Sequence, residues 1–219
     1  MLFDILLPQR CTGCELPGPA LCPGCHDSLI RLAPPLCERC GSPSAWPVTR
    51  CAECAGRRIA FASARAAILY DAPARRLVQA WKERGQRRLV REAASLVVET
   101  LVRPNVTALA FVPGDAARAL ERGHRPAEAL ARELGRSWDL PVQAFLRRSR
   151  SVDRQRGLGL AERRRNVAGA FAPARASPVR VCLVDDVYAS GATAGAAASA
   201  LRRGGARRVE VVTLARAVR

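Results

Sequence analysis

The sequence has few of the side chains that most often carry acid–base chemistry. Lys82 is its one lysine among 219 residues, and His26 and His124 are its two histidines. Nothing in the sequence orients either imidazole beside a nucleophile, and His26 directly follows a cysteine pair. A histidine general base is therefore not expected.

Long apolar runs are also absent, since no stretch reaches the roughly 18 residues that a membrane-spanning helix needs. The first nine residues have an acid inside their apolar run and no basic segment before it, so they do not resemble a signal peptide. We therefore expect a cytoplasmic protein without a membrane span. At 49% hydrophobic and 25% charged residues the chain is globular, and disorder is excluded.

Positive charge dominates the sequence but is unevenly distributed. The 36 basic and 19 acidic residues give a formal net charge of +17. Residues 1–54 contain four arginines and five acids, so the whole positive excess belongs to the rest of the chain. Such a surface attracts polyanions in a salt-dependent way, and phosphorylated metabolites and nucleic acids both qualify.

Eight of the nine cysteines form four C-x-x-C pairs near the start of the chain: Cys11 and Cys14, Cys22 and Cys25, Cys37 and Cys40, and Cys51 and Cys54. Two residues between thiolates let both sulfurs bind one ion, so four pairs predict two sites with four cysteines each. Zinc is the expected metal, and the all-cysteine ligand set makes it structural. Consecutive and interleaved pairings both satisfy the count, and we favour consecutive ones because their gaps are short. A disulfide scaffold is the alternative, which a cytoplasmic location disfavours.

This cysteine-rich segment predicts a double zinc ribbon over residues 1–56. The ninth cysteine, Cys182, lies in an apolar run and is expected to be a buried strand residue.

Strand and helix patterns alternate over residues 57–219, which predicts a second domain. Strands are expected at residues 66–70, 107–112, 140–146, 179–184 and 208–214, and helices at residues 74–102 (one or two), 126–136 and 192–203. Such alternation indicates an α/β fold with a doubly wound, mainly parallel sheet.

Two adjacent acids, Asp185 and Asp186, follow the apolar run at residues 179–184, and a short loop then opens into a helix. This order places carboxylates at the carboxyl edge of the sheet, where open α/β folds bind ligands. The acids can bind the hydroxyls of a ribose directly or through Mg²⁺. The loop and helix start can hold its 5′-phosphate through Ala189, Ser190, Gly191, Ala192 and Thr193. It is not a Walker A loop, because the single lysine lies elsewhere.

This segment resembles the signature with which type I phosphoribosyltransferases bind 5-phosphoribosyl 1-pyrophosphate (PRPP). The whole chain is similar to the ComF/ComFC family, in which a double zinc ribbon precedes a phosphoribosyltransferase-like domain. Leu7 to Cys11, Val112-Pro113, and the spacing of Gln155 to Phe171 carry the likeness further. Two departures are His124-Arg125-Pro126 where the family usually has Phe-Asn-Gln, and Ala189-Ser190 where it has Thr-Thr.

The resemblance implies a role in natural competence for DNA uptake and binding of PRPP with Mg²⁺. It further implies phosphoribosyl transfer to an acceptor that the sequence does not name, with Asp185 and Asp186 at the ribose and Arg118 and Arg122 facing pyrophosphate. The family's usual pairing favours a homodimer.

An arginine-rich segment, residues 147–165, gives an alternative from another functional class. It contains Arg147, Arg148, Arg154, Arg156, Arg163, Arg164 and Arg165 among eight arginines. The segment suits a lid over a leaving pyrophosphate, a path for single-stranded DNA, or simply a solvated charged face. The alternatives are thus a non-catalytic DNA-handling protein, working beside a competence helicase, and a PRPP-responsive regulator.

Overall fold

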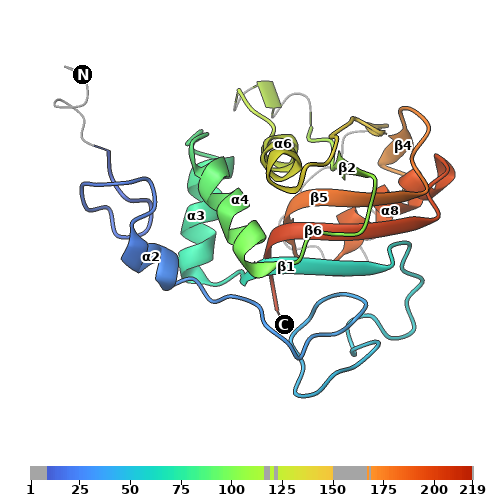
Figure 1. The fold of residues 1–219 in the computed structure, drawn as a ribbon, viewed down its shortest axis with the longest axis horizontal. Helices are drawn as coiled ribbons and strands as arrows, with labels where there is room; N and C mark the ends of the chain where they lie inside the picture. The colour runs from blue at the N-terminus through green and yellow to red at the C-terminus, as the bar shows by residue number, and fades with distance from the viewer. Residues whose placement is uncertain (1–8, 116–118, 121–122, 150–166, 168, 219) are drawn as a thin grey trace.

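The computed structural model describes residues 9–115, 119–120, 123–149, 167 and 169–218 (Figure 1). Its helices are α2 (Pro23–Asp27), α3 (Ala72–Lys82), α4 (Leu89–Thr100), α6 (Pro126–Trp138) and α8 (Ala192–Arg203). Its strands are β1 (Ser63–Leu69), β2 (Ala108–Phe111), β3 (Leu146–Arg148), β4 (Phe171–Pro173), β5 (Arg180–Tyr188) and β6 (Arg208–Arg216).

Four of these strands form a parallel sheet in the order β1-β6-β5-β2. The chain crosses from β1 to β2 through α3 and α4, and α6 then leads outward to Val142, which bridges Leu109 on the far side of β2; α8 leads in the opposite direction, from β5 to β6. Because crossovers between parallel strands are right-handed, these opposite directions place α8 on one face of the sheet and the other three helices on the other. The predicted α/β fold with a doubly wound, mainly parallel sheet is confirmed.

Helices cover both faces of the sheet, which explains why its central strands are apolar. Residues 181–184 of β5 are all buried, as expected for a strand packed on both sides. Cys182 is among them and fully buried, as predicted. The predicted helix at residues 192–203 coincides with α8, whose alanines pack closely on β5 and β6.

The structure resolves one predicted element and corrects another. The helical pattern at residues 74–102 divides into α3 and α4 around Gly85, whose φ of 70° ends the first helix. The strand expected at residues 140–146 is wrong: Val142 forms one parallel bridge to Leu109, and the chain then leaves the sheet. Leu146 instead begins β3, which pairs antiparallel with β4 in a small second sheet, so this long-range pairing prevails over the local strand pattern.

The cysteine-rich segment packs along the outer edge of β1. The amide of Leu69 donates to Ile30 O at 2.8 Å, and that of Ala64 to Arg39 O at 3.0 Å. The positive φ of Gly41 permits the close approach there, since a β-carbon on Gly41 would lie 2.4 Å from Ala64 O. These bonds cover an edge that would otherwise present unpaired backbone groups.

Candidate functional site

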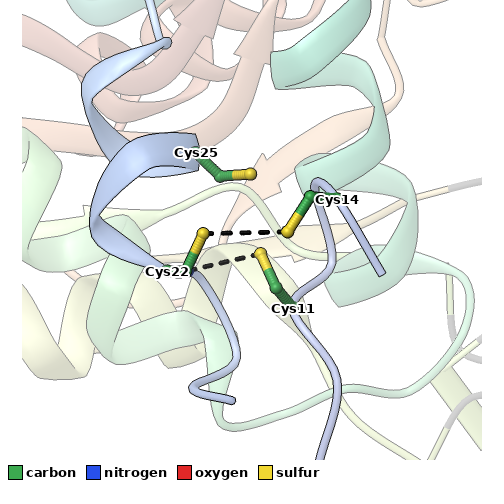
Figure 2. A group of neighbouring side chains, drawn as sticks. All are labelled: Cys11, Cys14, Cys22 and Cys25. Atoms are coloured by element: carbon green, nitrogen blue, oxygen red, sulfur yellow. Dashed lines mark hydrogen bonds between the residues drawn. The ribbon is translucent and has the colours of Figure 1, made fainter. Parts of the chain in front are cut away.

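The first four-cysteine cluster joins a loop to the start of α2 (Figure 2). Cys11 and Cys14 come from the loop, Cys22 caps α2 and Cys25 lies within it. The four sulfurs lie within 4.8 Å of one another, with Cys14 and Cys22 at 3.8 Å. The amide of Cys22 points at the sulfur of Cys11 at 3.3 Å.

The second cluster consists of Cys37, Cys40, Cys51 and Cys54, again within 4.8 Å. The sulfurs of Cys37 and Cys54 are 3.6 Å apart, and those of Cys40 and Cys51 are 3.4 Å apart. Each cluster unites neighbouring C-x-x-C pairs, so the consecutive pairing predicted from the sequence is confirmed. Three of these four cysteines are buried, whereas Cys14 of the first cluster is exposed.

Both clusters fit structural zinc. Four thiolates at about 2.3 Å from a tetrahedral ion lie about 3.8 Å from one another, close to the sulfur separations here. No side chain other than cysteine belongs to either cluster among the described residues. The ligand set is therefore complete, which is the arrangement of structural rather than catalytic zinc.

The thiols depend on a cation to ionise together. Burial and the neighbouring sulfurs raise the pKa of Cys25 to about 12 and that of Cys54 to about 11. At Cys11, burial also acts to raise the pKa, but hydrogen bonds from backbone amides prevail and lower it to about 6. Cys25 and Cys54 are therefore protonated at neutral pH without metal, and zinc binding must release these protons.

The acid pair lies within β5, near its carboxyl end, rather than after it, because the strand continues to Tyr188. Asp185 pairs with Thr213 of β6, whereas β2 ends opposite Val184. The acids therefore lie beyond the end of β2, at the carboxyl edge of the sheet, as expected for a ligand site. The amide of Asp186 donates to Asp185 Oδ1 at 2.9 Å.

Lys82 forms an ion pair with Asp186 that the sequence did not indicate. Its Nζ lies 2.5 Å from Asp186 Oδ2, and the two side chains are 18% and 9% exposed. The lysine ends α3, more than 100 residues before the acid. Close by, Nε2 of His124 donates to Trp81 O at 2.8 Å, so this imidazole has the orienting contact that the sequence did not show.

The phosphate loop, as we call residues 189–193, comprises the turn after β5 and the first two residues of α8. Gly191 precedes α8 with a φ of 70°, a conformation that favours glycine. A β-carbon at Gly191 would lie 2.2 Å from Oη of Tyr188, so the tyrosine occupies the space beneath the loop. The amide of Ala192 donates to Ser190 Oγ at 3.3 Å. The helix start leaves amide donors and a partial positive charge for an anion.

The remaining predicted site residues are only partly described. Arg118, Arg122, Arg154, Arg156, Arg163, Arg164 and Arg165 lie outside the described residues. Arg147 is exposed on β3, whereas Arg148 donates to Pro113 O at 3.3 Å and lies over the ring of Phe171. Arg148 is thereby held against the loop after β2.

Within the described part of the chain, no helix is long and apolar enough to cross a membrane.

Comparison with known proteins finds one domain model and two relatives whose names refer to competence or DNA utilization. Residues 2–56 match the double zinc ribbon domain model. Competence protein F of Haemophilus influenzae is 29% identical over 224 residues, covering 95% of this chain and 97% of that one. DNA utilization protein YhgH of Salmonella typhimurium is 27% identical over 228 residues, covering 97% and 99%. The similarity thus extends over nearly the full length of both relatives.

Two solved structures match part of this chain. Glutamine PRPP amidotransferase from B. subtilis, solved with ADP and GMP, is 20% identical with a TM-score of 0.40, and the match covers 57% of this chain and 26% of that one. The protein TT1426 from Thermus thermophilus is 21% identical with a TM-score of 0.35, over 59% and 83% of the two chains.

Proposed function

Since the chain belongs to the ComF family, we propose that it serves in natural competence and that its parallel sheet binds PRPP with Mg²⁺. The names of its two full-length relatives support the role in handling DNA. The observation that supports PRPP as the ligand is the order of chemical groups along the carboxyl edge of the sheet. Two carboxylates lie near the end of β5, and the phosphate loop follows Tyr188 and opens α8.

Each part of this edge suits one part of the ligand. Asp185 and Asp186 would accept hydrogen bonds from the ribose hydroxyls, and their hard oxygens also suit Mg²⁺. The amides at the start of α8, with Ser190 and Thr193, would hold the 5′-phosphate. Ala189 supplies no hydroxyl where the family usually has threonine, so backbone donors carry more of the phosphate binding here.

If the bound PRPP reacts, an acceptor atom forms a bond to C1 of the ribose while the bond from C1 to pyrophosphate breaks. No protein nucleophile is required, because the residues hold and polarise the substrate. Arg118 and Arg122 are proposed to neutralise the departing pyrophosphate. Lys82 is a further cation near the acids, and its ion pair with Asp186 holds that carboxylate in place before ligand arrives.

Calorimetric titration of the zinc-loaded protein with PRPP and Mg²⁺ tests the proposal. We expect micromolar binding in the wild type and its loss in the double variant Asp185→Asn/Asp186→Asn. Glu210→Gln is the matched control, because Glu210 is a carboxylate of the neighbouring strand that pairs with Arg208. No binding to the wild type, or equal binding to the double variant, contradicts the assignment.

A second proposed function, binding of single-stranded DNA, is favoured by the uneven charge. Thirty-two of the 36 basic residues follow residue 54, and Arg147 lies exposed on β3. Neutralised phosphates make affinity fall steeply with salt, so a shallow slope of log affinity against log salt counts against this function. Unchanged DNA binding after replacement of Arg163, Arg164 and Arg165 would also count against this function. A regulator would in addition require PRPP to change the affinity for DNA.

A cytoplasmic location is also proposed, because eight cysteines that serve as zinc ligands need a reducing compartment.

A further inference from the structure

The second cysteine cluster is in direct contact with the parallel sheet through Arg216, the last residue of β6. Its side chain is 1% exposed. Nη1 donates to the backbone oxygen of Cys40 at 2.6 Å, and Nη2 lies 3.6 Å from the sulfur of Cys40. Nη2 also donates to Glu53 Oε2 at 2.6 Å. One buried guanidinium thus holds a metal ligand and the loop that carries the last cysteine pair.

The same guanidinium also contacts Tyr188, the residue that precedes the phosphate loop. It lies over the ring of Tyr188, 4.5 Å from the centroid. Tyr188 is the residue of β5 that pairs with Arg216, and it fills the space under Gly191. A change in the position of Arg216 therefore reaches the loop through one packed ring, since buried groups transmit displacements.

Arg57 makes a second connection between the same two places. Its Nη1 donates to the backbone oxygen of Glu53 at 2.9 Å, and its Nη2 to that of Ser190 at 3.2 Å. Glu53, between Cys51 and Cys54, is thus held by both arginines. Since each arginine also contacts the phosphate loop or its support, the two connections reinforce each other.

The first cluster contacts a different part of the molecule. Thr12, next to Cys11, donates from Oγ1 to Oε1 of Gln86 at 2.9 Å. Nε2 of His26, next to Cys25, lies 3.3 Å from Oε2 of Glu99 on α4. Among the described residues, no hydrogen bond or ion pair joins this cluster to the phosphate loop. The chain therefore contains two similar metal sites, of which one serves as a control for the other.

We propose that Arg216 is a positioning residue that couples the second cysteine cluster to the phosphate loop. Metal in this cluster fixes Cys40 and Glu53, these fix Arg216, and Arg216 with Tyr188 sets the conformation of residues 189–193. The ribbon then serves as a structural support of the anion site. The identity of the ligand rests on the proposed function, whereas the coupling does not.

Hydrogen exchange followed by mass spectrometry tests the coupling without any ligand. Cys51→Ser/Cys54→Ser removes the second site and Cys14→Ser/Cys22→Ser the first, and each variant should retain one zinc. We expect exchange of the peptide covering residues 189–193 to accelerate about tenfold or more in the first of these variants alone, as local opening becomes easier. Peptides of α6 report whether the fold persists. Equal loop exchange in both variants overturns the proposal.

Glu53→Gln provides a variant that keeps all eight cysteines. It removes the charge that Arg216 contacts, on a side chain that is 29% exposed. We expect two zinc ions per chain, unchanged exchange in α6 and faster exchange in the phosphate loop. Unchanged exchange in the loop overturns the role of Arg216, because a purely local structural role of Glu53 would leave the loop as it is.

Coupling between two sites is reciprocal, so a ligand bound to the phosphate loop must also strengthen metal binding at the second cysteine cluster. PRPP with Mg²⁺ should slow the release of one of the two zinc ions to the chelator 4-(2-pyridylazo)resorcinol, and Glu53→Gln should abolish this protection. If calorimetry shows that PRPP binds and both ions leave at unchanged rates, the coupling is refuted. If PRPP does not bind, the proposed ligand is wrong, and loop exchange alone decides the coupling.

Discussion

Replacing Lys82 by methionine removes one charge from an ion pair at the candidate site while keeping an unbranched side chain of similar length. The Nζ of Lys82 lies 2.5 Å from Asp186 Oδ2, and the carboxylate side chain is 9% exposed. Asp186 would then remain in a largely buried position without its cation. We expect the free energy of unfolding to fall, because an uncompensated buried charge is unfavourable.

The burial of the pair sets the size of this effect. Removing one partner of a fully buried ion pair costs about 3–5 kcal/mol, and exposed pairs contribute about 0–1 kcal/mol. Lys82 is 18% exposed, so water screens the pair in part. We therefore expect Lys82→Met to cost about 2–3 kcal/mol. The coupling energy in a double-mutant cycle with Asp186→Asn should be about 2 kcal/mol.

Urea unfolding of the zinc-loaded single and double variants measures this coupling. The pair of Glu128 and Arg132 on α6 is the matched control. Oε1 of Glu128 lies 2.7 Å from Nη2 of Arg132, and the arginine side chain is 60% exposed. That pair should couple by about 0.3–0.5 kcal/mol. A coupling energy for Lys82 and Asp186 no larger than the control would refute the argument that burial makes this contact strong.

Three further predictions concern the loop, the metal and a helix start. Gly191→Ala should weaken phosphate binding about tenfold or more, because the left-handed backbone and the tyrosine beneath leave no room for a β-carbon. Gly195→Ala, which meets open space in α8, should bind normally and raise the free energy of unfolding by about 0.5–1 kcal/mol. Zinc affinity should fall as the pH falls, because Cys25 and Cys54 have raised pKa values and protons compete with the metal. Chelator titrations that show no pH dependence would contradict this. Asp71→Ala removes the side chain that caps α3 and should lower the free energy of unfolding by about 1 kcal/mol in calorimetric scans, and no change would argue against the cap.

The features that the sequence predicted well are local ones. A C-x-x-C pair places two sulfurs together within one turn, so the pairs and their consecutive grouping follow from short spacings. Asp185, Asp186 and the phosphate loop are contiguous, and the glycine between strand and helix indicates the turn. The alanine-rich pattern of α8 ends at Gly204 in the sequence and in the structure.

The contacts that sequence analysis missed join residues far apart in the chain. Lys82 reaches Asp186 and Arg216 reaches Cys40 because the order of strands in the sheet brings α3 and the end of β6 to these places. No local pattern marks either residue. Only their residue type could have drawn attention to them. Lys82 is the one lysine in an arginine-rich sequence, and Arg216 is a charged residue directly after an apolar strand pattern.

The predicted division between residues 56 and 57 stays a prediction. Arg57 donates to Glu53 on one side and to Ser190 on the other, so contacts cross this point in both directions.

The central claim is that the end of β5 and the phosphate loop bind the ribose phosphate of PRPP. The measurement that tests it most directly is amide nitrogen–proton NMR of the zinc-loaded protein during titration with PRPP and Mg²⁺. The account predicts that the largest shifts occur at residues 185–193, and that Asp185→Asn/Asp186→Asn removes them. Shifts confined to other regions, such as β3 with its exposed Arg147, would contradict the claim and direct attention to the basic surface instead.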